Sequence, residues 1–495
     1  MALRITGFCG IDIGTQGVRV SILAADGSEL GAGAAALPSG RREGPRHEQD
    51  PSSWWPAVVE ATRSALTAAG NVDVEAVALD ATSGTVVVEA IDGTATGPAL
   101  MYDDARAGAQ ADRAQRAGAQ LWEALGYRMQ PAWALPKALW LLENGALKSG
   151  DRIVHQSDHV VRQIVGRTVA TDTSNALKTG CDLTTGTWPV AVLDTLSLSP
   201  TLLPELVWPG TQVGVVCADA AAATGLRQGT PVRAGMTDGC ASQIATNALR
   251  PGSWSSALGT TLVVKGSTSS LVRDPGGAVY CHRHPDGGWL PGGASSTGSG
   301  ALATVNPGND REVFDALTEQ ARALVPVSGA TYPLVGRGER FPFVAPEAEG
   351  FADGTPSTAA ERFAAICQGI SYVERLAYDV LGWLGAEVDG PVAFSGGAAR
   401  NAWWNQLRAD ALGRVAVVPS STQAASGMAI LAASPPGELT ATAERMVRFV
   451  ERHEPDPDRT AALRPGYERL VHAFADRGWL SADLADAVLT SGSLR

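Results

Sequence analysis

The chain has 495 residues, of which 45% are hydrophobic and 18% charged, a composition typical of a globular protein long enough for two domains. Its net charge of −12 disfavours a nucleic acid or an anionic membrane as partner, because either would need a basic face. Its six scattered cysteines lack CxxC spacing and no apolar run reaches the length of a membrane span, so we expect a soluble cytoplasmic protein without a zinc site or disulfides.

The first predicted elements are two strands joined by a glycine-rich turn. The first strand carries Asp12, the turn is Gly14-Thr15-Gln16-Gly17, and the second strand covers residues 18–23. Glycines let the main chain approach an anion without a Cβ in the way, so the turn predicts a phosphate site formed by N–H groups and the Thr15 hydroxyl. A carboxylate beside a phosphate is repelled unless a cation lies between them, which indicates Mg²⁺ at Asp12. An ordinary edge hairpin with a solvated aspartate is the alternative.

Alternating helices and strands follow this hairpin and predict an α/β fold. Ser and Pro residues before a run of helix formers mark a helix start near residue 50. Helices are expected at residues 50–69, 105–125 and 136–148, and strands at residues 74–80 and 85–88.

Two turns in this half carry candidate sugar-binding residues. Thr82 and Ser83 follow the strand at residues 74–80, while Asp104 and Arg106 lie where a strand gives way to a helix. A carboxylate accepts hydrogen bonds from two neighbouring hydroxyls at once, which suits the recognition of a polyol. The alternatives are plain turn formation for Thr82 and Ser83, and a capping aspartate near a solvated arginine for the other pair.

A second hairpin half a chain later repeats the plan of the first. Its strands cover residues 255–258 and 262–266, and its turn is Gly259-Thr260-Thr261. Two such turns suggest a duplicated domain in which each half contributes one phosphate-binding hairpin to a shared cleft. We expect the two domains to cover residues 1–248 and 249–495.

Asp238 is the first choice for a catalytic residue. It lies in a glycine-flanked turn between a short strand and a helix predicted at residues 241–249, directly before the second hairpin. A carboxylate that faces two phosphate-binding turns can take the proton of an attacking hydroxyl, which phosphoryl transfer to an alcohol requires. The alternative is an aspartate that caps a helix.

The second half also contains a glycine pair after an apolar strand. Ser395-Gly396-Gly397 follows the strand at residues 392–394, and Asn401 opens a helix that reaches Leu412. A backbone without side chains can lie flat against an adenine, although a tight strand-to-helix turn explains the same residues. Further helices are expected at residues 359–384 and 424–433, before a charged helical tail.

Taken together, these motifs resemble the FGGY family of sugar kinases, within the actin-like, sugar-kinase and Hsp70 ATPase superfamily. The resemblance covers nearly the whole chain, and its specificity lies in the order of short motifs. They are residues 10–17, 47–55, 98–106, 136–137, 235–239, 257–261 and 395–401. The resemblance implies two ribonuclease-H-like α/β domains with a catalytic cleft between them, the sugar mainly on residues 1–248 and ATP mainly on residues 249–495.

The resemblance also implies roles for individual residues. Asp238 resembles the general base, and Asp12 resembles the residue that organises Mg²⁺. The residues that resemble the phosphate grips are Gly14, Thr15, Gln16, Gly259, Thr260 and Thr261, those that resemble the adenosine site are Gly396, Gly397 and Asn401, and those that resemble the sugar site are Asp104 and Arg106.

Departures from the family pattern bear on the substrate. Thr82 and Ser83 stand where many xylulose kinases have Met-His, and Tyr102 replaces their usual Trp. The sequences at residues 80–85, 101–106 and 237–240 are most similar to the xylulokinase-like branch that includes D-ribulose kinases.

The resemblance therefore implies ATP-dependent phosphorylation of a ketopentose at its terminal hydroxyl, with D-ribulose converted to D-ribulose 5-phosphate. D-Xylulose, or another FGGY polyol or sugar acid, is the alternative substrate. An actin- or Hsp70-like ATPase without a sugar substrate is the alternative of a different class. We expect ATP and Mg²⁺ as cofactors, no nucleic-acid or membrane partner, and a monomer or homodimer.

Overall fold

The computed structural model describes residues 5–354 and 356–490. They form two compact units. Unit 1 contains the described residues up to Asn247 together with residues 282–287 and 421–448, and unit 2 contains the others. The first break between the units lies one residue before the expected boundary after residue 248. The two units are not contiguous halves of the chain, because residues 282–287 and 421–448 come after the first break but belong to unit 1.

Unit 1 is built on a six-stranded sheet. Its strands are β1 (Ile5–Ile13), β2 (Gly17–Leu23), β3 (Glu29–Ala36), β6 (Val72–Ala81), β12 (Gln212–Val215) and β13 (Pro231–Arg233). They lie in the order β12-β13-β6-β1-β2-β3. Strand β1 pairs antiparallel with β2 and parallel with β6, and β6 pairs parallel with β13. Strands β3 and β12 add antiparallel pairs at the two edges.

Unit 2 repeats this arrangement. Its strands are β14 (Trp254–Leu258), β15 (Leu262–Gly266), β17 (Trp289–Ala294), β20 (Val392–Ser395), β21 (Ala416–Pro419) and β22 (Phe449–His453), in the order β17-β15-β14-β20-β21-β22, and β16 (Tyr280–Arg283) extends the sheet at the β17 edge. Strand β14 pairs antiparallel with β15 and parallel with β20, which pairs parallel with β21. Strands β17 and β22 add antiparallel pairs. The same order and directions therefore recur, which confirms the predicted two-domain α/β fold.

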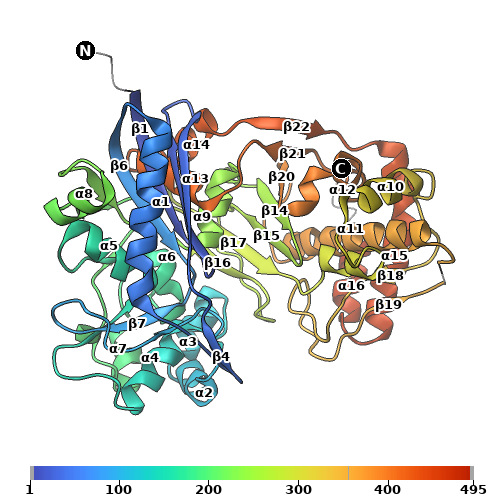
Figure 1. Ribbon diagram of the computed structural model, residues 1–495. Helices are drawn as coiled ribbons and strands as arrows, with labels where there is room; N and C mark the ends of the chain where they lie inside the picture. Colours follow the sequence, from blue (N-terminus) through green and yellow to red (C-terminus); the bar gives the residue numbers. More distant parts are fainter. Residues whose placement is uncertain (1–4, 355, 491–495) are drawn as a thin grey trace. The chain divides into compact units, whose positions relative to one another are not determined.

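Helices from distant parts of the chain pack on the unit 1 sheet. Helix α1 (Trp54–Ala69) contacts β2 and β3, whereas α13 (Ala424–Ala433) contacts β1 and α9 (Asp238–Ala245). Figure 1 shows α13 beside the blue strands of unit 1. A Cβ on Gly10 would lie 1.8 Å from the Ala425 carbonyl oxygen, and a Cβ on Gly427 would lie 1.9 Å from the Ala241 carbonyl oxygen. Glycine at both positions is therefore what allows residues 421–448 to join unit 1.

Alternation along β1 decides which residues enter the core. Ile11 and Ile13 are fully buried in the same hydrophobic cluster as Val20 and Trp54. Burying such side chains stabilises the fold by about 2 kcal/mol each. Because successive side chains of a strand point to opposite faces, Asp12 points to the same face as Gly10, the face that α13 covers.

The remaining strands among the described residues belong to three smaller sheets. These strands are β4 (Arg41–Glu43), β5 (Arg46–Gln49), β7 (Val86–Glu89), β8 (Ala99–Leu100), β9 (Arg152–His155), β10 (Thr171–Asp172), β11 (Leu206–Val207), β18 (Thr331–Tyr332) and β19 (Phe351–Ala352), in the orders β4-β5-β8-β7-β9, β10-β11 and β18-β19. The other helices are α2 (Gly108–Ala117), α3 (Ala119–Leu125), α4 (Ala134–Glu143), α5 (Gln156–Val165), α6 (Thr173–Ala176), α7 (Val190–Thr195), α8 (Ala218–Thr224), α10 (Arg311–Ala321), α11 (Ala359–Trp383), α12 (Ala402–Leu412), α14 (Leu439–Met446), α15 (Pro457–Asp476) and α16 (Ala482–Thr490).

Several elements differ from the sequence prediction, among them the helix expected at residues 136–148, which covers Ala134–Glu143. The helix expected at residues 105–125 is divided at Gly118, and the helix expected at residues 241–249 begins at Asp238 and ends at Ala245. The tail expected to be helical contains strand β22, whose residues are mostly exposed and polar. Strand β22 forms because β21 offers it an antiparallel partner, which is information that lies outside its own sequence.

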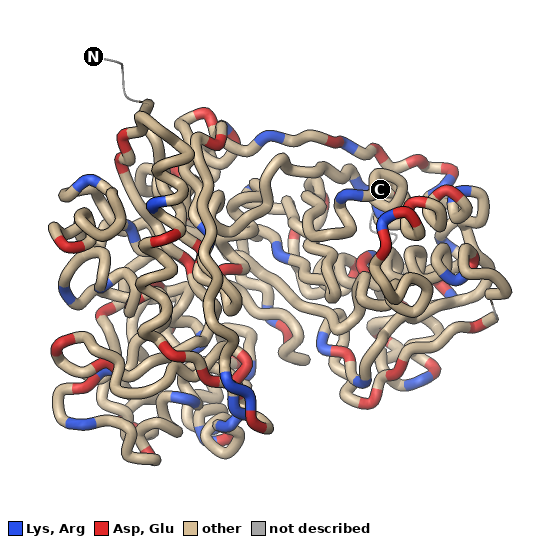
Figure 2. The backbone as a smooth tube through the Cα atoms, viewed as in Figure 1, with Lys and Arg blue, Asp and Glu red and all other residues tan. Residues whose placement is uncertain are grey.

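Charge is distributed over both units. Figure 2 shows acidic and basic residues interspersed along the chain, whose net charge is −12. Among the described residues, no helix combines the length and the apolar character that a membrane span requires.

Candidate active site

The carboxyl ends of three parallel strands bring the predicted acidic residues of unit 1 together. Asp12 lies near the end of β1, Thr82 follows β6, and Asp238 follows β13 as the first residue of α9. Ala81 and Thr237 form a parallel bridge, so the chain leaves β6 and β13 side by side. Because the carboxyl ends of parallel strands meet at one edge of a sheet, Asp12, Thr82 and Asp238 share this edge.

A third carboxylate lies at this edge. Asp80 stands opposite Asp12 in the register of β1 and β6 and is fully buried, while Asp12 is 7% exposed. Burial raises the pKa of Asp12, and the charge of Asp238 adds to the rise. Burial raises the pKa of Asp80 well above its usual range, and the charges of Asp12 and Asp238 add to it. No role was predicted for Asp80, although a charged residue inside an otherwise buried apolar strand was an available signal.

The first glycine-rich turn has three of its carbonyl groups hydrogen-bonded within unit 1. Three hydrogen bonds engage them: Gly14 N–H to Gly17 at 3.0 Å, Leu37 N–H to Gln16 at 2.9 Å, and Gln49 Nε2 to Thr15 at 3.1 Å. Carbonyl oxygens repel phosphate, so a turn that binds phosphate has to direct them away and present its N–H groups. Gln49 therefore supports the turn, and its place in the motif at residues 47–55 was the only sequence signal for it.

The carbonyl groups of the second glycine-rich turn, in unit 2, are also hydrogen-bonded within the protein. They accept three hydrogen bonds: Gly259 N–H to Thr261 at 3.1 Å, Ser299 N–H to Gly259 at 2.9 Å, and Gly300 N–H to Thr260 at 3.2 Å. Thr260, in the middle of this turn, is exposed. In both turns three carbonyl oxygens accept hydrogen bonds within the protein, and anion binding by the turns stays a prediction.

The glycine pair after β20 lies beside the second turn. Strand β20 runs parallel to β14, so Gly396 follows the strand next to the one that ends at Leu258. Gly396 has φ +81°, and a Cβ there would lie 2.5 Å from the Leu258 carbonyl oxygen, so the position requires glycine. A Cβ on Gly397 would meet no atom within 4 Å. Unit 2 therefore gathers Gly396, Gly397 and the Gly259 turn at one edge of its sheet.

Asn401 has a structural role in unit 2. Its Oδ1 accepts a hydrogen bond from Trp404 N–H at 3.1 Å, which caps α12, and its Nδ2 donates to Thr318 Oγ1 at 2.9 Å. Both ends of the amide are therefore used within the protein. Contact between Asn401 and adenosine stays a prediction.

The turn after β6 is held by side-chain hydrogen bonds. Thr82 Oγ1 lies 2.6 Å from Thr85 Oγ1 and donates to Gln156 Oε1 at 2.8 Å. The Ser83 carbonyl oxygen accepts from Lys178 Nζ at 3.0 Å, and within the described chain no partner reaches the buried Ser83 Oγ. The turn is therefore ordered, and Ser83 retains hydrogen-bonding capacity for another group.

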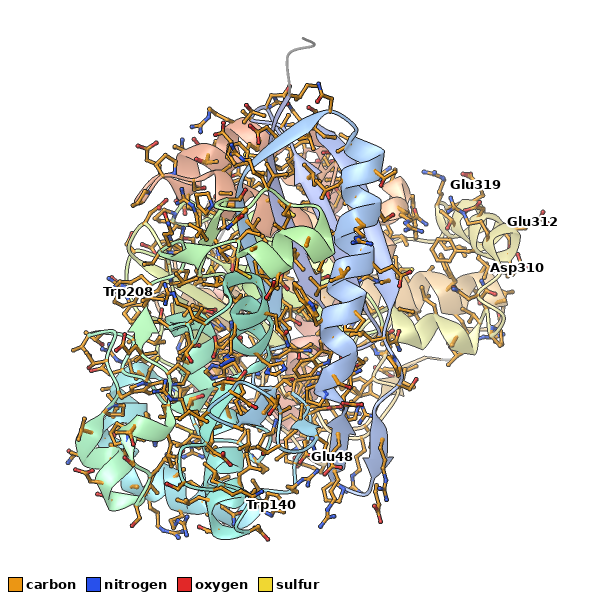
Figure 3. All side chains as sticks on the ribbon, turned by 60° about the vertical axis from the view of Figure 1, so that its left-hand side comes forward. Glu48, Trp140, Trp208, Asp310, Glu312 and Glu319 are labelled. Atoms are coloured by element: carbon orange, nitrogen blue, oxygen red, sulfur yellow. The ribbon has the colours of Figure 1, made fainter. Side chains whose placement is uncertain are left out.

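Asp104 and Arg106 form a closed ion-pair cluster. Asp104 is fully buried and accepts hydrogen bonds from His47 N–H at 2.7 Å and from Arg106 Nη2 at 2.6 Å. Arg106 also donates to Glu48 at 2.7 Å and lies 4.9 Å from the centre of the Trp140 ring. Figure 3 labels Glu48 and Trp140 in the same part of unit 1. Asp104 and Arg106 are thus already paired, and their contact with a sugar stays a prediction.

Lys137 connects two of the turns that carry candidate sugar-binding residues. It is fully buried, and its ammonium group donates to the carbonyl oxygens of Gly84 at 3.0 Å and Met101 at 2.5 Å. Gly84 follows Ser83, and Met101 precedes Tyr102. Burial lowers the pKa of Lys137 to about 7. Whether it is charged or neutral, the Lys137 amine therefore connects the turn at Gly84 to the turn at Met101 through its two hydrogen bonds.

The acidic edge of unit 1 fits a divalent cation that keeps most of its water. In residues 5–354 and 356–490, no group of three or more His, Cys, Asp or Glu side chains is arranged to hold a metal ion. Mg²⁺ needs no such group, because it is usually bound through one or two carboxylates plus substrate phosphates. Arg19 lies 3.6 Å from Asp12 but is 60% exposed, so solvent weakens that pair. Asp80 and Asp12 share a hydrogen bond, and the repulsion among Asp12, Asp80 and Asp238 that helps raise the pKa values of Asp12 and Asp80 would be relieved by a cation at Asp12.

Comparison with known proteins covers nearly the whole chain. Residues 8–245 match the N-terminal domain of the FGGY family of carbohydrate kinases, and residues 255–434 match its C-terminal domain. The chain is 28% identical over 475 residues to a xylulose kinase of Streptomyces rubiginosus, covering 92% of this chain and 95% of that protein. It is 27% identical over 503 residues to an autoinducer-2 kinase of Escherichia coli, covering 94% of each. The crystal structure of xylulose kinase from Rhodospirillum rubrum has the same fold, with a TM-score of 0.84 at 22% identity over 95% of this chain and 99% of that one.

Proposed function

The chain belongs to the FGGY family of carbohydrate kinases, and from this premise we propose that it transfers the γ-phosphate of ATP to the terminal hydroxyl of a ketopentose. One observation carries the proposal. Asp238 follows β13 at the same sheet edge as Asp12 and the ordered turn at Thr82 and Ser83. The proposed base, the residue proposed to hold Mg²⁺ and the proposed sugar-binding turn thus lie at one sheet edge of unit 1, which supports the proposal.

Asp238 is the proposed general base. Its carboxylate takes the proton of the terminal hydroxyl while the sugar oxygen forms a bond to the γ-phosphorus. The bond between that phosphorus and the bridging oxygen then breaks, and ADP leaves with the electron pair. Gly239 N–H donates to Asp238 Oδ1 at 2.8 Å, so this carboxylate has a defined orientation at the start of α9.

The two glycine-rich turns are proposed to hold the phosphates of ATP. Three carbonyl oxygens of each turn are engaged within the protein, so the hydroxyls of Thr15 and Thr260 and the N–H groups other than those of Gly14 and Gly259 are the parts of the turns that suit an anion. Asp12 is proposed to hold Mg²⁺ through water or directly, and the cation would neutralise charge on the phosphates. Gly396 and Gly397 are proposed to lie against adenosine, because their turn is next to the second phosphate-binding turn.

D-Ribulose is the proposed acceptor, with D-xylulose as the second candidate. The residues at 80–85, 101–106 and 237–240 support D-ribulose through their similarity to that branch of the family. The names of relatives such as the Streptomyces rubiginosus xylulose kinase support D-xylulose. The two sugars differ only in the configuration at C3, so the hydrogen-bonding groups near Thr82 and Ser83 are the proposed source of the choice.

An assay that couples ADP release to a spectroscopic signal tests this proposal. D-Ribulose, D-xylulose, glycerol and D-gluconate would each be supplied with ATP and Mg²⁺. We expect the highest kcat/KM for D-ribulose, at least about tenfold above D-xylulose, which corresponds to about 1.4 kcal/mol of discrimination. A higher value for D-xylulose would replace the proposed substrate, and ADP release that no sugar stimulates would support an ATPase of the actin or Hsp70 type.

A further inference from the structure

One buried carboxylate organises the segment that supports the second phosphate-binding turn. Glu339 is 2% exposed and lies outside every motif that the sequence associated with function. Its carboxylate accepts hydrogen bonds from hydroxyl and backbone N–H groups: Oε2 from Ser295 Oγ at 3.0 Å, Thr297 Oγ1 at 2.9 Å and Tyr332 OH at 2.8 Å, and Oε1 from Ser296 N–H at 2.5 Å and Arg340 N–H at 2.9 Å. Hydrogen bonds to a charged acceptor are stronger than neutral ones, so this carboxylate fixes residues 295–297 firmly.

The hydrogen bonds continue from residues 295–297 to the beginning of β15. Ser295 N–H donates to the Leu262 carbonyl oxygen at 2.9 Å, and Leu262 N–H donates to the Thr297 carbonyl oxygen at 2.8 Å. Leu262 directly follows Thr261, the last residue of the turn. The position of residues 295–297 therefore sets the position of the strand end that carries the turn.

The next residues reach the turn itself. Ser299 donates to the Gly259 carbonyl oxygen from both its N–H at 2.9 Å and its Oγ at 2.6 Å, and Gly300 N–H donates to the Thr260 carbonyl oxygen. A Cβ on Gly298 would lie 2.5 Å from Thr261 Cα, so no space separates the segment from the turn. A shift of residues 295–300 would therefore move the turn or release its carbonyl groups.

We propose that Glu339 is a positioning residue for nucleotide binding, which acts through residues 295–300 on the turn Gly259-Thr260-Thr261. The inference rests on the proposed function, because it takes this turn to hold a phosphate of ATP. Without the carboxylate, the hydroxyls of Ser295 and Thr297 lose their acceptor and the segment loosens. The carbonyl groups of the turn can then rotate toward the phosphate, which they repel.

Isothermal titration with ADP tests this proposal on the full-length protein. Glu339→Gln keeps the size of the side chain but replaces one carboxylate oxygen with an NH₂ group that cannot accept a hydrogen bond. We expect the Kd for ADP to rise about tenfold, as for the loss of a hydrogen bond to a charged group. Glu349→Gln is the matched control, because Glu349 is 71% exposed and pairs only loosely with Arg337 at 3.9 Å, and its Kd should match that of the wild type.

A second variant keeps the test decisive if Glu339→Gln folds poorly. Thr297→Val removes one hydroxyl bond to Glu339 without changing the shape of a residue that is 1% exposed. We expect its Kd for ADP to rise about threefold. Thr62→Val is the control, because Thr62 is fully buried and, among the described residues, its Oγ1 has no hydrogen-bond partner.

The pattern of effects separates positioning from general structural support. The proposal requires the KM for ATP to rise while the KM for the sugar stays within about twofold. An unchanged Kd for ADP in folded Glu339→Gln and Thr297→Val would overturn the proposal while leaving the proposed function intact. A parallel loss of ADP affinity, sugar affinity and thermal stability would overturn it as well. A wild-type protein that does not bind ADP would instead remove the nucleotide site itself and with it the premise of this inference.

Discussion

Asp12 and Asp80 stand opposite each other in the register of the parallel strands β1 and β6. Like charges directly opposite across a sheet destabilise it, and here burial raises the pKa of both groups. The folded protein therefore retains protons on this pair at pH values where the unfolded chain has released them. This relationship links the stability of unit 1 to pH and to the charge at the candidate cation site.

Replacing Asp80 with Asn is expected to raise the free energy of unfolding at neutral pH, because Asn is neutral at this buried position opposite Asp12 without having to take up a proton. In the wild type, the unfolded chain loses its Asp proton above pH ~4 while the folded state keeps it, so the free energy of unfolding falls as pH rises from about 4 towards neutrality. The free energy of unfolding of Asp80→Asn should fall less than that of the wild type over this pH range. Urea unfolding between pH 4.5 and 7.5 measures both effects. Glu75→Gln, at an exposed position of β6, is the control, and parallel pH profiles for wild type and Asp80→Asn would contradict the prediction.

Replacing Asp238 with Asn is expected to lower kcat by about 10² to 10⁴, the usual contribution of a general base, while the Kd for ADP stays within about twofold. The change preserves size and removes the ability to take a proton. Steady-state kinetics and titration with ADP provide the two measurements. Asp219→Asn serves as control, since Asp219 is exposed in the first turn of α8. If Asp238→Asn kept more than about a tenth of the wild-type kcat, a loss under ~1.4 kcal/mol, another residue would have to be the base.

Replacing Lys137 with Met is expected to raise the KM for the sugar several-fold, because the two turns next to Ser83 and Tyr102 lose the hydrogen bonds that connect them. The pH dependence of stability should also change. The pKa of about 7 in the folded protein lies below the value of ~10.4 in the unfolded chain, so wild-type stability should rise relative to Lys137→Met from about pH 7 to pH 10.

Kinetics with varied sugar and urea unfolding at pH 7 and 9 check the Lys137 prediction. Lys148→Met is its matched control, because Lys148 is exposed. A KM for ATP that rises as much as the KM for the sugar would show that Lys137 supports more than the two turns.

Replacing Gly427 with Ala is expected to destabilise unit 1 by about 3 kcal/mol, because the new Cβ would lie 1.9 Å from the Ala241 carbonyl oxygen and force α13 away from α9. Thermal unfolding measures the loss. Gly97→Ala is the control, because a Cβ there meets no atom within 4 Å. A loss below about 1 kcal/mol for Gly427→Ala would mean that α13 contributes little to the packing of unit 1.

Much of the fold could be predicted because its signals are local. The two glycine-rich turns, the apolar alternation of β1 and the ends of α13 at Ala424 and Ala433 follow from residues that are neighbours in sequence. Strand β22 could not be predicted, since its five residues are stabilised by pairing with β21 rather than by their own pattern. The same contrast holds at the site, where Asp12 and Asp238 stood out by their motifs, while Gln49 and Lys137 lay in motifs without an assigned role and Glu339 lay outside every motif.

By itself, the sequence determined that the chain is a duplicated α/β protein with two glycine-rich turns and two prominent acidic residues, because glycine spacing and alternation act over a few residues. Only the tertiary structure decided that Asp80 opposes Asp12, that α13 joins unit 1 and that Glu339 accepts hydrogen bonds from residues 295–297. Each of these depends on strand register or on contacts between residues tens to hundreds of positions apart. Such contacts are selected by packing of the whole unit, which no short stretch of sequence encodes.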